Sequence, residues 1–450
     1  MAFLRFQEKI AVNQHGQLQT VGVFALAAIG LSGIAGAMAA LVLYTAPQLA
    51  PLLLLGLIGV IPVVALGLAR FHALVFLGIA SLGVVRWEPA PVDMLLPLLL
   101  VLGLLAGRLS LRELQNASII HASLWVFVAI NLASLLVARD LVYSIRYLVI
   151  TFYLMGLAYF VRLYITSQER MRLVLFGYVV AALLSVFLVG LELFGLSPTS
   201  EFFIREQRAL ALFKDANVFA PFLILPILFL FDELLRPHLI PGRSWLKIGA
   251  MLALCAGVFL AFSRAGWANL LVALMAYLAM SARSLSWWQW ARLILLTLVG
   301  LVVLAVLVVQ LNLLSFLLWR ATPLQSYDSD RFGTQMVGIE AGLSHLFGIG
   351  PGMLFDAHSL YVRTFAEYGV FGFVALFIAL LVPLFYCFRR ARSASDRVHG
   401  LSARVVTACM VGLLLNGLVI DLIHWRSFWV LFALCWIVAA VQSYEERQKR

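Results

Sequence analysis

Long uninterrupted apolar runs constrain the fold of this chain more than any motif does. A run of roughly 18–25 apolar residues is long enough to cross a bilayer as an α-helix. The chain has 450 residues, of which 64% are hydrophobic and only 12% are charged, and this composition excludes a soluble domain of that length. Because backbone polar groups in lipid must be paired within their own segment, we predict helices and exclude open sheets. The runs do not alternate between apolar and polar residues, which excludes a transmembrane barrel.

The runs predict an all-α fold, a polytopic transmembrane helical bundle of about 12–14 spans. The lower number applies if the short runs at 72–86 and 92–107 are re-entrant or interfacial. We expect residues 1–450 to form a single integral membrane domain. The expected spans are 21–44, 50–68, 72–86, 92–107, 118–138, 143–162, 171–195, 217–235, 246–262, 265–281, 288–314, 369–388, 404–424 and 427–444.

The distribution of lysine and arginine predicts the orientation. Short cytoplasmic loops carry an excess of these residues, so Arg5 and Lys9 place the N-terminus in the cytoplasm, and the basic tail places the C-terminus there as well. The net charge of +11 is scattered over such loops, which argues against a nucleic-acid partner. No apolar core precedes residue 20, so a cleaved signal peptide is not expected. The four cysteines lie in apolar runs without a CxxC pair, and we expect buried free thiols.

Several basic residues fall on the opposite, outer side, where the positive-inside rule disfavours them. They are Arg205, Arg208, Lys214, Arg264, Arg320, Arg331, Arg363 and Arg426. Each could snorkel or form a structural ion pair. As a set on one face they favour an anion site, because arginine presents a planar fork of donors suited to phosphate and stays charged where water is scarce.

The one long connection is the outer loop at about 315–368, and ordered loops of this length are usually functional. Its stretch Thr334–Leu346 has apolar residues at helical spacing, a turn follows at Gly348–Gly352, and 357–368 has the pattern of a helix entering the membrane. We therefore predict an ordered cap of short helices on the membrane surface.

His358 is the best-placed titratable residue of this loop, since it follows the glycine-rich turn on the arginine-bearing side. A neutral imidazole can accept a proton from an attacking hydroxyl, although a histidine near a helix start is often only a capping residue. Arg264, at a tight junction between two runs, must be paired or face a cavity. It could bind phosphate or pair with Asp421 or Glu367.

Other polar residues on the outer side have structural and functional interpretations. Asp215 or Asn217 could cap the helix that follows, and a helix N-terminus also favours anions. Tyr361 is the helical neighbour of His358. We expect a supporting role for the residues Asn217, Tyr361, Arg363, Asp421, His424 and Arg426.

The Asp328-x-Asp330 pattern is the only hint of a metal site, and it is too short to predict one. The motifs GxxxxGK[ST], HExxH and GxSxG do not occur in the sequence. An ATP-driven pump, a zinc protease and a serine hydrolase of these classes are therefore excluded, and we expect neither a metal nor a cofactor.

Four outer segments together resemble a known family. They are SRAGW with Arg264, DRFG with Arg331, HLFGIGPG at 345–352, and HSLYVRTFAEYG at 358–369, and LFKDANVFAPF adds a match to the family's F-x-x-x-N-x-F stretch. In this order and on one side they resemble the O-antigen ligase and O-antigen polymerase superfamily of bacterial membrane glycosyltransferases. The resemblance covers about residues 200–440. Ser359 departs from it, because asparagine is common at that position, and this leaves the subfamily open.

The resemblance implies a GT-C-type, multi-pass enzyme of the bacterial inner membrane with a periplasmic active site. It would transfer a glycan from undecaprenyl pyrophosphate to lipid A-core oligosaccharide in a metal-independent, inverting reaction. Arg264 and Arg331 match pyrophosphate-binding arginines, Arg208 and Lys214 are further candidates for this contact, and His358 matches the proposed catalytic histidine. From the residues themselves, fixed cations would stabilise the departing pyrophosphate.

Two alternatives remain open at this stage. A polymerase of the same superfamily would use a second lipid-linked glycan as acceptor. A lipid-linked glycan transporter without chemistry would carry ionisable residues at mid-membrane and helices related by a repeat. The sequence has no such repeat, and its ionisable residues gather at the surfaces.

Overall fold

A computed structural model describes residues 69–114, 118–197, 201–320, 326–354 and 357–448. The chain divides into two compact units, one of residues 1–75 and 93–109, and one of residues 76–92 and 110–450. The predicted spans 21–44 and 50–68 lie outside the described residues. The single domain expected over 1–450 stays a prediction.

The smaller unit is described at the start of α3 (Phe71–Ala80) and in most of α4 (Pro91–Leu105). Within it, the backbone of Gly103 packs closely on Phe71 and Leu109, because an added Cβ would lie 2.9 Å from Phe71 and 2.7 Å from Leu109. Helices of 10 and 15 residues are shorter than a bilayer crossing requires. The short runs at 72–86 and 92–107 therefore form short helices.

The larger unit is a bundle of helices with two very small strand pairs. Its helices are α5 (Ser118–Ser134), α6 (Leu141–Tyr164), α7 (Gln168–Leu193), α8 (Ala216–Phe222), α9 (Ile224–Leu235), α10 (Ser244–Leu260), α11 (Arg264–Ser281), α12 (Trp287–Gln310), α13 (Leu314–Arg320), α14 (Ser326–Ser344), α15 (Leu360–Ala391), α16 (Ala403–Asn416) and α17 (Arg426–Gln448). Short 3-10 turns are at Leu111–Leu114, Leu135–Val137 and Ala282–Ser284.

Six stretches among the described residues are long and apolar enough to cross a membrane. They are Ile119–Val137, Leu141–Tyr164, Gln168–Leu193, Ala216–Leu235, Leu360–Ala391 and Arg426–Gln448. The predicted class, an all-α polytopic helical membrane protein, is confirmed at this level. Cys387, Cys409 and Cys435 are buried free thiols as expected, and Cys255 is also free but only half-buried.

Side-chain caps fix the starts of several helices. The Asp215 side chain accepts a hydrogen bond from Asn217 N at 2.8 Å and thus caps α8, which decides between the two capping residues that the sequence allowed. Ser263 caps α11 by accepting from Gly266 N at 3.1 Å, and Ser359 caps α15 by accepting from Val362 N at 3.4 Å. Such caps satisfy amides that have no partner within the helix.

Three predicted spans differ from the helices that form. The run 217–235 is two helices that meet at Leu223, since Pro226 has no N–H to donate to the carbonyl four residues earlier. The run 404–424 is helical only as far as Asn416. The expected entry helix at 357–368 and the span 369–388 are merged into α15, which has a non-helical residue, Gly369, at φ 65° and ψ −171°.

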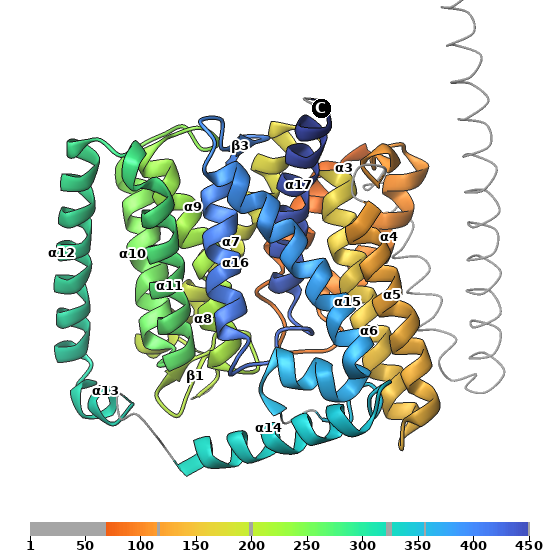
Figure 1. Cartoon of the computed structure of the whole chain (residues 1–450). Helices are drawn as coiled ribbons and strands as arrows, with labels where there is room; N and C mark the ends of the chain where they lie inside the picture. The colour runs from red at the N-terminus through yellow and green to blue at the C-terminus, as the bar shows by residue number, and fades with distance from the viewer. Residues whose placement is uncertain (1–68, 115–117, 198–200, 321–325, 355–356, 449–450) are drawn as a thin grey trace, which may run out of the picture. The chain divides into compact units, whose positions relative to one another are not determined.

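The connection at 315–368 contains α13 and α14, and α14 begins before the predicted helical stretch Thr334–Leu346 and has 19 residues. Its place on the membrane surface stays a prediction. Figure 1 shows α14 lying across one end of the upright helices of the larger unit, with the β1 hairpin near the same end and β3 at the other end. The strands β1 (Ile204–Arg205) and β2 (Arg208–Ala209) pair antiparallel, as do β3 (Arg397–Val398) and β4 (Leu401–Ser402).

Candidate functional site

His358 lies directly before α15 in a backbone conformation that is unusual for a residue with a side chain. Its φ is +45°, in the left-handed region, which histidine enters more often than most residues but at a cost in free energy. The turn is held by the next residues, because Leu360 N donates to Gly417 O at 2.8 Å and Ser359 Oγ donates to the same oxygen at 3.3 Å. His358 is thus positioned by the end of α16, and it is half-buried.

Gln335 connects the cap helix α14 to this turn. Its Nε2 lies 3.5 Å from His358 O and 3.4 Å from Leu418 O, as a donor to both. Arg331 precedes Gln335 by four residues in α14 and therefore shares its helical face. The structure thus brings the helix face that carries Arg331 to the backbone of His358.

Arg208 and Asn217 meet the start of α11. Arg208 Nη2 donates to Asn217 Oδ1 at 2.8 Å, and Ser263 Oγ donates to the same oxygen at 2.8 Å. Arg208 Nε also donates to Ala261 O at 3.2 Å. Arg264, next in the chain after Ser263, is half-buried. We call this group, from Arg208 and Asn217 to Ser263 and Arg264, the β2–α11 cluster.

Left-handed backbone conformations also occur around the β2–α11 cluster. Glu206, Gln207 and Ala211 have φ between 50° and 61°, and Phe262 has φ 45°. None of these is glycine, so the surrounding structure must hold each against a steric penalty. Segments at Arg208, Arg264 and His358 therefore all contain strained backbone.

The β2–α11 cluster and His358 lie at the same end of the bundle. Arg404 Nη1, at the start of α16, donates to Ser284 Oγ at 2.5 Å, just beyond the end of α11. The two helices therefore run antiparallel, and their close packing is marked by Gly412, where an added Cβ would lie 2.4 Å from Asn269 Oδ1. The start of α11, with Arg264, is accordingly at the end of α16 that accepts the hydrogen bonds from the His358 turn.

Arg363 forms buried ion pairs with two carboxylates, Glu367 and Asp421. Its Nε donates to Glu367 Oε1 at 2.9 Å and its Nη1 to Asp421 Oδ2 at 2.6 Å. Arg363 and Glu367 are almost inaccessible to solvent. Glu367 and Asp421, which the sequence offered as possible partners of Arg264, thus both pair with Arg363. The supporting role of Arg363 and Asp421 at a functional site stays a prediction.

Glu367 also fastens the glycine-rich turn. Its Oε1 accepts from Leu354 N at 3.2 Å, while its backbone oxygen accepts from Gly350 N at 3.1 Å. An added Cβ on Gly348 would lie 2.2 Å from that backbone oxygen, so only glycine allows this close approach. The turn before His358 is therefore tied to the first two turns of α15.

His424 lies in the segment between α16 and α17 and is held as a neutral imidazole. Burial and the nearby Arg363 guanidinium lower the pKa of His424, and the Asp421 carboxylate raises it. The net effect is a pKa of about 3. Its Nε2 is 3.1 Å from Thr151 Oγ1, and its Nδ1 is 3.8 Å from Asp421 Oδ2. The ring also meets Tyr147 edge-on at 5.1 Å between centroids.

The remaining predicted residues have varied environments. Tyr361 OH donates to Leu414 O at 2.6 Å, which ties α15 to α16. Lys214 is exposed and pairs with Glu88, a surface ion pair rather than part of a buried cluster. Arg426 begins α17 and is half-buried. Within the described residues, no group of three or more His, Cys, Asp or Glu residues is arranged to hold a metal.

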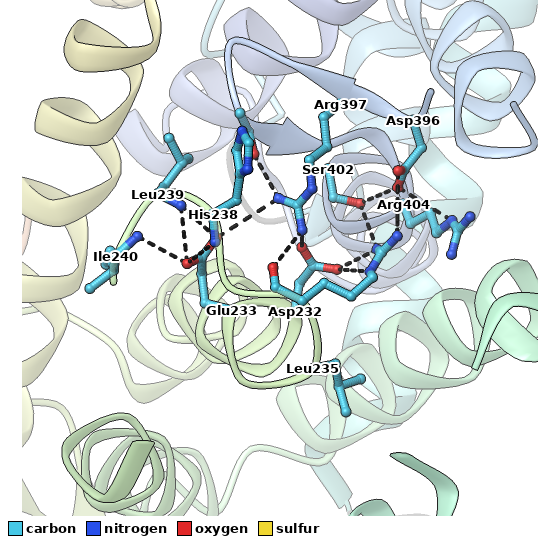
Figure 2. Close-up of polar contacts among 12 residues, drawn as sticks. Asp232, Glu233, Leu235, His238, Leu239, Ile240, Asp396, Arg397, Ser402 and Arg404 are labelled. Atoms are coloured by element: carbon cyan, nitrogen blue, oxygen red, sulfur yellow. Dashed lines mark hydrogen bonds and ion pairs between the residues drawn. The ribbon is translucent and has the colours of Figure 1, made fainter. Parts of the chain in front are cut away.

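A second polar cluster lies at the opposite end of the bundle, around the β3–β4 hairpin (Figure 2). Asp232 pairs with Arg236 and, at 2.9 Å, with Arg397, while Asp396 Oδ2 lies 3.3 Å from Arg404 Nε. The Glu233 carboxylate next to it accepts the backbone amides of residues 238–240 at distances of 2.9 to 3.1 Å. Arg236, Arg397 and Arg404 are therefore neutralised in ion pairs.

Sequence reasoning missed Gln335 and the central role of Glu367. Glu367 had a usable signal, because an acid beside an apolar run is costly unless it is paired. Gln335 had none, since its contacts depend on how α14 crosses α15. Similarly, the positive φ angles of Phe262 and His358 could not be predicted from the sequence, because residues other than glycine rarely adopt them.

The chain matches no protein-family model, and no curated protein matches it. The fold and composition define it as a multi-pass helical membrane protein with clusters of polar and basic side chains at both ends of the bundle.

Proposed function

We propose that the chain is a membrane glycosyltransferase that moves a glycan from undecaprenyl pyrophosphate to a hydroxyl of lipid A-core oligosaccharide. The proposal includes the GT-C-type architecture of about 12–14 spans, cytoplasmic termini, and an active site at the periplasmic face of the bacterial inner membrane. It rests on the segments that resemble the O-antigen ligase and polymerase superfamily.

The observation that carries the proposal is the placement of His358. It has a strained backbone at the end of the bundle where Arg264 also begins α11, and Gln335 connects it to the helix that carries Arg331. Strain of this kind persists at functional sites when the surroundings over-determine it. Guanidinium groups near the membrane surface suit a diphosphate carried on a lipid.

The proposed reaction needs one base and several fixed cations. The acceptor hydroxyl attacks the anomeric carbon and its proton passes to the His358 imidazole. A glycosidic C–O bond forms as the C–O bond to pyrophosphate breaks, and the electron pair leaves with the pyrophosphate. Arg264 and Arg331 stabilise the growing negative charge, with Arg208 as a further candidate. Attack from the face opposite the pyrophosphate inverts the anomeric configuration.

The test uses the purified chain in nanodiscs with an undecaprenyl pyrophosphate-linked glycan as donor. His358→Ala should abolish transfer to lipid A-core while donor binding is retained. His345→Ala is the matched control, because His345 is an exposed histidine directly after α14 whose Nδ1 lies 3.0 Å from Ala341 O of that helix. Undiminished transfer by His358→Ala would remove this residue from its catalytic role.

The acceptor distinguishes the related activities. Transfer to lipid A-core supports the ligase, whereas elongation of a second lipid-linked glycan would identify a polymerase. Movement of the donor across liposomes without a new glycosidic bond would identify a transporter and contradict the proposed chemistry.

A further inference from the structure

The cap helix α14 has one face packed on the protein and another face that is apolar and exposed. Phe332, Met336, Leu343 and Leu346 are 50%, 60%, 74% and 63% exposed. Their spacing puts them on one side of the helix or its immediate continuation. We call these four residues the α14 stripe. A soluble surface would not hold such a row without a partner.

Another side of α14, about 100° around the helix from the stripe, is fixed to α15 by glycines. An added Cβ on Gly338 would lie 2.5 Å from side-chain atoms of Leu354 and Val362, and one on Gly342 would lie 2.3 Å from Phe365. This contact leaves the helix no freedom to turn the α14 stripe inward. Whatever covers the stripe must therefore come from outside the described residues.

The α14 stripe continues into an exposed apolar ridge on α15. Directly after the stripe, the Phe347 ring lies 5.8 Å from the ring of Phe371, between centroids. From there, exposed apolar residues recur along one side of α15 at intervals of three and four. They are Phe371, Val374, Ile378, Leu381, Phe385 and Phe388.

The exposed ridge on α15 indicates what covers the α14 stripe. It runs along a helix that is long and apolar enough to cross a membrane, and an exposed apolar ridge over the length of such a helix faces lipid. Because Phe347 and Phe371 join the two surfaces, the environment of the ridge extends onto the stripe. Polar residues such as Thr334 and Ser344 lie at the surface on other sides of α14, as an interfacial helix requires.

We infer that α14 is an interfacial helix whose stripe inserts into the outer leaflet of the bilayer, with lipid acyl chains as its partner. The inference does not depend on the proposed glycosyl transfer. It also sets the height of the Arg331 side of the helix relative to the lipid headgroups.

The test places a nitroxide label at single positions of the full chain in phosphatidylglycerol–phosphatidylcholine nanodiscs. Met336→Cys and Leu343→Cys probe the stripe, and Thr334→Cys and Ser344→Cys are matched controls at polar surface positions on other sides of the same helix. Label bound to the native cysteines is measured on the unsubstituted chain and subtracted. The ratio of collision with oxygen to collision with a water-soluble nickel chelate should be several-fold higher at the stripe positions than at the controls.

Two results would overturn the inference. Chelate access at the stripe equal to that at the controls would mean that the helix stands clear of lipid. Spin–spin broadening at Leu343→Cys that disappears on dilution with unlabelled chain would mean that a second copy covers the stripe. Circular dichroism of each variant establishes that the helical fold is retained.

Discussion

Glu367 offers the sharpest test of how the outer end of the bundle is stabilised. Its carboxylate accepts from Arg363 Nε at 2.9 Å and from Leu354 N at 3.2 Å, in a site closed to solvent. Glu367→Ala leaves a buried guanidinium with Asp421 as its remaining carboxylate and removes the acceptor for the Leu354 amide.

The expected loss is large because one partner of a buried pair remains. Breaking such a pair from one side costs about 3–5 kcal/mol. Glu367→Gln keeps an acceptor oxygen for the Leu354 amide and removes only the charge, so we expect a loss of about 1.5–3 kcal/mol, the value of a hydrogen bond to a charged group.

The assay is equilibrium unfolding of the purified chain in mixed micelles as the fraction of denaturing detergent rises. Glu446→Gln is the matched control, because its pair with Arg389 at 3.0 Å involves an arginine side chain that is 49% exposed. That pair is worth about 0–1 kcal/mol. If Glu367→Ala falls within this control range, the reasoning about the buried pair is wrong.

Three further predictions follow from single residues. Gly369→Ala should prevent accumulation of folded protein, because Gly369 has φ 65° and an added Cβ would lie 1.9 Å from Leu346 O; a normal yield of monodisperse protein would contradict this. Burial, as the largest cause, lowers the pKa of His424 from 6.5 to about 3, so the unfolded state binds the proton first and stability should fall as pH drops from about 6.5 toward 3. Thermal unfolding across this range should show a smaller fall for His424→Gln, and an unchanged slope would argue against it. Asp232→Asn keeps an acceptor oxygen beside Arg397 and removes only the charge, so it should lower stability by about 1.5–3 kcal/mol, and a change below about 1 kcal/mol in the same micelle titration would refute this estimate.

The helices could be predicted well because lipid leaves the backbone few alternatives. The run 427–444 corresponds to α17 at Arg426–Gln448, and 143–162 to α6 at Leu141–Tyr164. The errors occur where a local residue interrupts the pattern. Pro226 divides one run into α8 and α9, and Gly369 joins two expected helices across a break.

The sequence could not predict the side-chain pairings around the candidate site. That the basic residues near Arg264 and His358 mark a functional site stays a prediction. Arg363 and Glu367 are four residues apart in α15, so helical spacing alone allows this pair. The contact of Arg363 with Asp421 depends on which segments are neighbours, and hydropathy carries no information on that. The roles assigned to Arg264, Arg331 and His358 stay predictions.

The break at Gly369 divides the mechanical roles of α15. The whole helix has 32 residues, about 48 Å at 1.5 Å per residue, which exceeds a hydrocarbon core of about 30 Å. Its first nine or so residues are hydrogen-bonded to the glycine-rich turn and to the end of α16. These residues move together with the glycine-rich turn, whereas the part of α15 after Gly369 is the part that would cross the membrane. A change in bilayer thickness would therefore tilt or shift the part after Gly369 first. The break at Gly369 would keep that movement from reaching His358.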